Sequence, residues 1–97
     1  MRIIARRTLR EFWEKHPTAA GPLRSWYREA SQASWDGPES IKRRYQHASF
    51  LAGNRVVFNI GGNKFRLVVH ANYAYKVLYI RFVGTHADYD RINPEII

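Results

Sequence analysis

The chain has 97 residues, 14% of them aromatic and 25% charged, and its 16 lysines and arginines exceed its 8 acidic residues to give a net charge of +8. This length is enough for one compact core, so we expect a single domain over residues 1–97 and exclude large multi-step catalytic architectures. The chain has no cysteine, which excludes disulfides, thiolate metal sites and cysteine nucleophiles. No stretch has the pattern of a signal peptide or a membrane span, so we expect a cytoplasmic protein.

The positive charge is concentrated in the middle of the chain. All eight acidic residues lie before Ser40 or after Ala87, whereas eight of the lysines and arginines lie between these positions. Such a surplus, interleaved with aromatic residues, is typical of a protein that binds nucleic acid or another polyanion. A basic surface that only maintains solubility is the alternative, and charge alone does not distinguish RNA, DNA and an acidic protein partner.

Residues 1–45 predict helices after a short first strand. Residues 1–4 are apolar and include two β-branched isoleucines, which favours a strand. Thr8 and Glu11 have the spacing of an N-terminal capping box, and a second helix is expected to begin at Thr18. A further helical turn over residues 38–45 would carry Lys42, Arg43 and Arg44. The side chains expected to face the core from the first two helices are Leu9, Phe12, Trp13, His16, Leu23, Trp26, Tyr27 and Ala30.

The second half of the chain predicts strands. Residues 55–60, 65–71 and 77–83 are rich in β-branched and aromatic residues, and turn residues at 61–63 and 72–76 predict two hairpins. Helices followed by such strands predict an α+β fold, with two N-terminal helices packed on one face of a mostly antiparallel sheet. The face toward the helices is expected to hold Val56, Phe58, Ile60, Phe65, Leu67, Val69, Leu78, Ile80 and Phe82.

The opposite face of the sheet is expected to be a basic and aromatic platform. Directly after the last strand, Thr85 and Asp88 have capping-box spacing. His86 and Tyr89 would then share one face of a short helix beside the strand that carries Arg81. The strand residues assigned to the platform are Arg55, Val57, Asn59, Lys64, Arg66, Val68, His70, Val77, Tyr79, Arg81 and Val83.

Three common kinds of site are poorly supported by the sequence. The paired glycines at 61 and 62 open a hairpin rather than a helix, so they do not form a phosphate-binding loop. The four histidines are scattered over different elements without the spacing of a zinc site, and no serine lies in a nucleophile elbow. We therefore expect neither a metal ion nor a cofactor.

The residues of the platform suit metal-free cleavage of RNA, in which the ribose 2′-OH attacks the adjacent phosphate. Arg66 and Arg81 have the planar guanidinium that binds phosphate oxygens and stabilises the charge of the transition state. Histidine ionises near neutral pH, so His86 is a candidate acid or base. Tyr89 is a second candidate base if neighbouring cations favour its ionised form. The structural alternatives are two exposed strand cations, a helix-start histidine and a partly buried core tyrosine.

Three segments together carry a resemblance to a known family. Residues 56–67, with the turn Asn59-Ile60-Gly61-Gly62-Asn63, are followed by Tyr79-Ile80-Arg81 and by Thr85-His86-Ala87-Asp88-Tyr89-Asp90. In this order and spacing they closely resemble the HigB toxins of the RelE/ParE superfamily of bacterial toxin–antitoxin systems. Arg7-Thr8-Leu9 and residues 21–27 also fit the family pattern, so the resemblance covers nearly the whole chain.

The resemblance implies a RelE-like fold and a ribosome-dependent endoribonuclease that cuts mRNA during translation and arrests growth. Its partner would be a cognate helix-turn-helix antitoxin, similar to HigA, that neutralises the toxin and represses its own operon. The toxin would then contact operator DNA only as part of that complex, and we expect no contact with a membrane. By position, the resemblance implies catalytic roles for Arg66, Arg81, His86 and Tyr89. We expect Arg55, Asn59, Asn63 and Lys64 to hold RNA, and Lys42, Arg43 and Arg44 to contact ribosomal RNA or the antitoxin.

Two functions of another class remain open: an RNA-binding module without catalysis, and a ParE-like inhibitor of DNA gyrase. An RNA binder would use the cations together with the stacking aromatics Tyr73, Tyr75 and Tyr79. Because binding alone has no use for His86, the substitution His86→Ala separates the catalytic function from these alternatives.

Overall fold

A five-stranded sheet forms the centre of the computed structural model, which describes residues 1–97. β3 (Arg55–Ile60), β4 (Phe65–Asn72) and β5 (Val77–Thr85) are joined by two hairpins and pair antiparallel. β1 (Arg2–Ile4) runs parallel to β5, and β2 (Ser49–Leu51) pairs antiparallel with β3, which gives the order β1-β5-β4-β3-β2. The predicted mostly antiparallel sheet is confirmed. β2 was not predicted, because three residues are too few to show a period.

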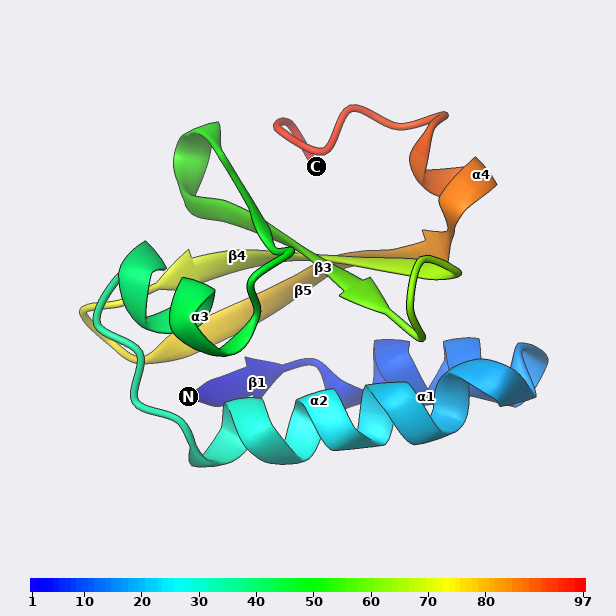
Figure 1. The fold of residues 1–97 in the computed structure, drawn as a ribbon, viewed down its shortest axis with the longest axis horizontal. Coiled ribbons are helices and arrows are strands. Elements are labelled where there is room, and N and C mark those ends of the chain that lie inside the picture. Colours follow the sequence, from blue (N-terminus) through cyan, green and yellow to red (C-terminus); the bar gives the residue numbers. More distant parts are fainter.

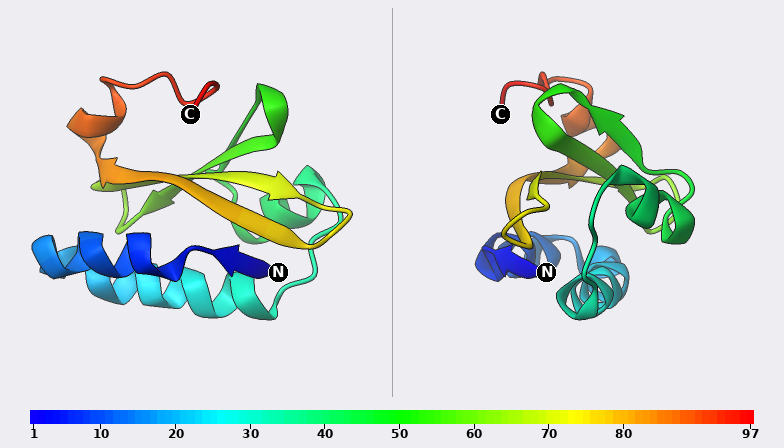
Figure 2. Two further views of the ribbon diagram at one scale, coloured as in Figure 1. Left: turned by 180° about the vertical axis from the view of Figure 1, so that it is seen from behind. Right: turned by 90° about the vertical axis from the view of Figure 1, so that its left-hand side faces the viewer.

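Two helices cover one face of this sheet (Figure 1). α1 (Arg6–Lys15) leads through a 3-10 turn at Pro17–Ala19 into α2 (Ala20–Gln32), which lies beside it. α3 (Pro38–Arg44) is the predicted basic helical turn, and α4 (His86–Tyr89) follows β5. Figure 2 shows α1 and α2 on one side of the sheet and the C-terminal residues on the other, which confirms the predicted α+β arrangement. None of the helices is long and apolar enough to cross a membrane.

A hydrophobic core lies between the helices and the sheet. Trp13 of α1 and Trp26 of α2 are 6% and 2% exposed, as predicted for core residues. The Trp26 ring meets Phe58 of β3 edge-on, with 5.3 Å between the ring centroids, and Trp35 stacks on the same phenylalanine. No polar or charged residue is buried, so the stability of this core depends on apolar area removed from water.

A β-bulge in β5 changes the predicted faces of that strand. Val68 of β4 pairs with Phe82 and Val69 pairs with Ile80, so Arg81 has no partner in the ladder. The extra residue reverses the alternation beyond it. Val83 therefore packs against the core and Phe82 lies on the opposite face, and the predictions for these two side chains are wrong.

The start of each early helix also differs from its prediction. α1 begins at Arg6 with Ala5 as its N-cap, so Thr8 lies inside the first turn and the predicted capping box with Glu11 is wrong. A cap needs extended backbone at the capping residue, and here the chain passes directly from β1 into the helix. The second helix begins with the 3-10 turn, and its α-helical part starts two residues after Thr18.

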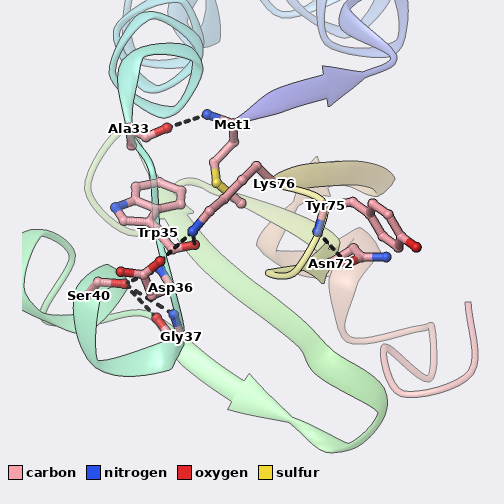
Figure 3. A network of polar contacts seen from close by, with 9 residues as sticks. All are labelled: Met1, Ala33, Trp35, Asp36, Gly37, Ser40, Asn72, Tyr75 and Lys76. Carbon is pink, nitrogen blue, oxygen red and sulfur yellow. Dashed lines mark hydrogen bonds and ion pairs between the residues drawn. The ribbon is translucent and has the colours of Figure 1, made fainter.

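A polar network ties the β4–β5 hairpin to the loop before α3 (Figure 3). The Lys76 ammonium donates to the carbonyl oxygen of Trp35 at 3.0 Å and to the Asp36 carboxylate at 2.5 Å. The hydrogen bond and the charge of Lys76 lower the pKa of Asp36. The backbone nitrogen of Met1 donates to the carbonyl oxygen of Ala33 in the same region. Lys76 is thus one of the central basic residues whose charge serves the fold.

Candidate active site

The face of β3, β4 and β5 that points away from α1 and α2 is called here the outer face. Its side chains form three rows across the strands, because residues in register on antiparallel neighbours point to the same side. The first row is polar, the middle row is apolar, and the third row is again polar. From β3 to β5, the rows are Asn59, Arg66 and Gly84, then Val57, Val68 and Phe82, and then Arg55, His70 and Tyr79.

The middle row corrects the predicted platform. Val57 and Val68 are only 3% and 0% exposed, although they face away from the helices. The C-terminal residues run over this side of the sheet (Figure 1), and Arg55 Nε donates to the carbonyl oxygen of Ile97 at 3.1 Å. The outer face is therefore not a continuous basic and aromatic surface. Alternation predicts the direction of a side chain but not the segment that covers it.

Arg66 lies where the β3–β4 hairpin meets the start of α4. Its Nη1 donates to the carbonyl oxygens of Asn63 and Phe65 at 3.1 and 3.2 Å, which holds the guanidinium beside the hairpin. The backbone N–H of His86 donates to the carbonyl oxygen of Lys64 at 3.1 Å. These contacts bring the predicted catalytic residues Arg66 and His86 to the same end of the outer face.

α4 begins with the capping box predicted for Thr85 and Asp88. The Asp88 N–H donates to Thr85 Oγ1 at 3.1 Å, and the Thr85 N–H donates to Asp88 Oδ2 at 3.2 Å. The bond from the Thr85 backbone is the main cause that lowers the pKa of Asp88. The box fixes the first turn of a helix too short to be stable alone, and so fixes the direction of the residue after the cap, His86.

The imidazole of His86 lies next to a carboxylate that was not predicted to belong to the site. Its Nδ1 lies 3.2 Å from Oδ2 of Asp90, and both side chains are more than half exposed. A carboxylate beside Nδ1 orients the imidazole ring and leaves Nε2 to face a substrate. The spacing of four residues on a helix is the sequence pattern that indicates this pair.

Tyr89, on the same short helix, packs toward the middle row of the outer face. Its ring lies 6.4 Å from the ring of Phe82, and its side chain is half-buried. Phe82 in turn lies over Gly84, where a Cβ atom would approach its Cζ to 2.5 Å. Tyr89 is therefore anchored by an aromatic contact that depends on the bulge in β5.

Arg81 lies toward the third row rather than beside Arg66. As the bulge residue it is exposed, and its guanidinium carbon lies 5.6 Å from the ring centroid of Tyr79. Tyr79 stacks on His70 with 6.0 Å between centroids. Burial, followed by the charges of Arg55 and Arg81, lowers the pKa of His70. His70 was placed on the platform but not in the site, and only its tertiary neighbours mark it as unusual.

The remaining predicted cations divide into free and engaged groups. Lys64 and Arg43 are exposed and form no ion pair or hydrogen bond through their side chains. Lys42 donates to the carbonyl oxygen of Ala48 at 3.0 Å, and Arg44 pairs with Glu29 at 2.6 Å. α3, which carries the three basic residues at 42–44, lies at the opposite end of the molecule from α4 (Figure 1). The structure thus separates these residues from His86.

The three tyrosines proposed as a stacking surface do not form one. Tyr73 packs against the core, and its burial raises its pKa. Tyr75 is 81% exposed at the β4–β5 hairpin, and Tyr79 is covered by His70 and Arg81. Of these three rings only Tyr75 is freely exposed, so they offer no surface on which successive bases could stack.

A second basic region lies on the helix side of the molecule. Arg6, Arg24 and Arg28 line a groove of about 370 Å³ between α1 and α2 and form no ion pair. Arg6 and Arg24 lie over the Trp13 ring, at 5.3 and 4.9 Å from its centroid. The linear charge balance missed this groove, because three of the acids before Ser40 pair with basic residues outside it: Glu11 with Arg7, Glu29 with Arg44 and Asp36 with Lys76.

Comparison with known proteins identifies the family of this chain. Residues 19–92, which include all four predicted catalytic residues, match the HigB toxin family, described as the RelE-like toxic component of a toxin–antitoxin system. The chain belongs to the HigB family of toxins. The predicted family is confirmed, and the α+β structure is consistent with a RelE-like fold.

Two curated HigB relatives align over nearly the whole chain. The mRNA interferase HigB of Escherichia coli O6:H1 is 28% identical over 95 residues, which cover 96% of this chain and 92% of that protein. The mRNA interferase toxin HigB of Escherichia coli K12 is 30% identical over 93 residues, which cover 93% and 88%. The names of these relatives agree with the predicted endoribonuclease activity.

Proposed function

We propose that this HigB-family toxin is an mRNA interferase: a metal-free endoribonuclease that cleaves mRNA on the translating ribosome and thereby arrests growth. It would act in the cytoplasm, where translation takes place. The proposal is carried by the contact between the β3–β4 hairpin and the start of α4, which gathers a guanidinium, Arg66, and an ionisable imidazole, His86. The mRNA interferase names of the relatives support the same chemistry.

The proposed step needs two proton-transfer groups and fixed positive charge. One group takes the proton of the ribose 2′-OH while its oxygen bonds to phosphorus, and the bond from phosphorus to the 5′ oxygen breaks. The second group protonates that 5′ oxygen, leaving a 2′,3′-cyclic phosphate and a 5′-hydroxyl. His86 and Tyr89 would be these two groups, and Arg66 and Arg81 would stabilise the phosphorane. Asp90 would position the imidazole of His86.

The proposed partners follow from charge and from the family. Lys64 and Arg43 are free cations suited to RNA phosphates. α3, which carries Arg43, lies at the opposite end of the molecule from α4 (Figure 1), so it would contact ribosomal RNA while mRNA occupies the other end. Arg55, Asn59 and Asn63 would hold the message, and Lys42 and Arg44 would support α3 as a contact surface. A cognate helix-turn-helix antitoxin would neutralise the toxin and mediate any contact with operator DNA.

The test is a translation reaction in vitro with purified protein and a defined message, with cut sites mapped by primer extension. Cuts are expected on the translated message. Ribosome-free RNA, tested in parallel with and without a chelator, should stay intact. His86→Ala should lower the cleavage rate by about 10²- to 10⁴-fold and Arg66→Ala by about 10²- to 10³-fold, the usual effects of losing a proton-transfer group or a charge donor. Arg10→Ala, an exposed arginine of α1, is the matched control and should cleave normally.

Two results would contradict the proposal. Folded His86→Ala and Arg66→Ala proteins that retained full cleavage would remove these residues from the site. Intact message in every lane, from a wild-type protein that still arrests growth, would favour the gyrase inhibitor, and an assay of DNA supercoiling would then decide.

A further inference from the structure

A cavity of about 510 Å³ opens between the β3–β4 hairpin and the turn that follows α3. Tyr45, Ala48 and Phe58 form its apolar wall, and the Tyr45 and Phe58 rings meet edge to face with 5.1 Å between centroids. Gly62 lies at the mouth, where the absence of a side chain leaves the entrance open. The size and the apolar wall are typical of sites for small ligands.

The rim of this cavity offers amides that are free to bind a ligand. Asn59 Nδ2 donates to Asn63 Oδ1 at 3.4 Å, which leaves the Asn59 Oδ1 acceptor and the Asn63 Nδ2 donors without a protein partner. Gln46 and His47 project from the exposed tip of the facing turn, and their side chains form no hydrogen bond. Donors and acceptors thus approach the cavity from both of its sides.

The electrostatics of the cavity favour a neutral ligand over a phosphate. Arg44 is the one arginine or lysine in its lining, and its guanidinium is held by Glu29 at 2.6 Å and lies over the Tyr45 ring. A phosphate group would therefore meet no free cation here. A flat heteroaromatic ring would pack one face against the exposed part of the Tyr45 side chain, because Phe58 and Ala48 are only 1% and 4% exposed. The polar edge of the ring would then form hydrogen bonds with the amides of the rim.

The cavity is connected to the proposed catalytic end by the hairpin itself. Asn59 is the register partner of Arg66, and the carbonyl oxygen of Asn63 accepts a hydrogen bond from the Arg66 guanidinium at 3.1 Å. Asn63 therefore holds Arg66 through its backbone and lines the cavity with its side chain. A nucleotide whose phosphate bound to Arg66 would therefore lie next to a residue of the cavity lining, Asn63.

We propose that this cavity holds one nucleobase of single-stranded RNA beside the cleaved phosphate, and that Asn63, Gln46 and His47 read its edge. Side-chain amides bind base edges with paired donor and acceptor, so the cavity would give the toxin a preference for certain bases at its cut sites. Because this inference rests on the proposed RNA cleavage, the experiment has one arm that does not depend on cleavage.

In the first arm, the wild-type protein is titrated with each of the four nucleoside 5′-monophosphates and followed by ¹⁵N NMR. At least one should shift the resonances of Gln46, His47 and Asn63, and its dissociation constant should rise at least tenfold in the double variant Gln46→Ala, His47→Ala. Both residues are exposed, so the double variant should unfold at the wild-type temperature. Ser34→Ala, at an exposed serine between α2 and α3, is the matched control and should bind normally.

In the second arm, cut sites on translated message are compared between the wild type and the double variant. A changed distribution of bases at the cuts supports the base-reading cavity. An unchanged distribution, or no nucleotide-dependent shift at the cavity, overturns it even if cleavage itself is intact. Nucleotide binding at the cavity by a protein that cuts no message would instead overturn the nuclease function and leave the base site standing.

Discussion

At the residue scale, His70 shows how neighbours set the chemistry of one side chain. It stacks on Tyr79, faces Arg55 and Arg81, and its Nδ1 is buried without a hydrogen-bond partner. Burial is the first cause that lowers its pKa, and the two guanidinium groups add to it because they disfavour a further positive charge. His70 is therefore neutral at pH 7 among fixed cations.

This environment predicts a pH dependence of folding. Above about pH 6.5 His70 is neutral in the folded and in the unfolded protein. Below about pH 6.5 the unfolded chain binds a proton at this histidine, whereas the folded protein binds it only at a lower pH. The free energy of unfolding should therefore fall as the pH is lowered from 6.5 toward the depressed pKa. Urea denaturation at a series of pH values should show a smaller fall for His70→Gln than for the wild type. Identical profiles for the two proteins would contradict the prediction.

At the element scale, β5 and α4 act as one unit. The bulge at Arg81 turns Phe82 to the outer face, where it meets Tyr89, and the capping box at Thr85 begins α4 directly after the strand. Gly84 allows this arrangement, because the Phe82 ring occupies the space of a Cβ atom. The position of His86 therefore depends on a strand irregularity several residues before it.

Gly84→Ala tests this dependence without altering any proposed catalytic residue. The new methyl would lie 2.5 Å from Phe82 Cζ and 3.0 Å from Asp88 Cβ, so Phe82 and α4 must move. We expect the variant to lose about 1–3 kcal/mol of stability, as for other overpacked sites, and to lose cleavage beyond what partial unfolding explains. Denaturant unfolding and the translation assay measure the two effects. Gly21→Ala in α2, where a Cβ meets nothing within 4 Å, should leave both unchanged or raise stability slightly.

At the scale of the whole molecule, the helices support the outer face through the core rather than by direct contact. Leu23 and Trp26 of α2 are fully or almost fully buried against the sheet, and Phe58 lies next to the strand residues of the outer face. Charges are arranged on the same scale, since Glu29 and Asp36 neutralise Arg44 and Lys76 from distant parts of the chain. Free cations remain at Lys64 beside the outer face, at Arg43 on α3 and in the helix groove.

The contribution of the core is testable at Leu23, which is 0% exposed. Leu23→Ala should lower the free energy of unfolding by about 2–5 kcal/mol, because it removes buried methyl groups and leaves a cavity. In a domain of this size that is a large fraction of the total stability. Ile96→Ala, at a side chain that is 77% exposed, should change stability by less than about 0.5 kcal/mol in the same chemical denaturation experiment. Equal losses in the two variants would contradict the assigned core.

Local chemistry explains which elements could be predicted. Capping at Thr85 was predicted correctly, because every atom of the box lies within four residues. The same motif at Thr8 was wrong, because the preceding strand already starts the helix at Arg6. The predicted side-chain directions were correct for β3 and β4. At the end of β5 they were wrong, because one unpaired residue reverses the alternation of side chains beyond it. A bulge leaves no mark in the hydrophobic pattern when residues on both sides of it are apolar.

The sequence by itself determined the α+β class, the helical and strand segments, the family and the basic character of this protein. These properties depend on composition, on the period of the hydrophobic residues and on short-range spacing, all of which can be read from the linear sequence. The tertiary structure decided which cations are free, which apolar rows are covered, how Asp90 and His70 join the surroundings of the site, and where a cavity opens at the β3–β4 hairpin. These properties depend on contacts between residues far apart in sequence, and burial and charge pairing arise only when the packed chain brings them together.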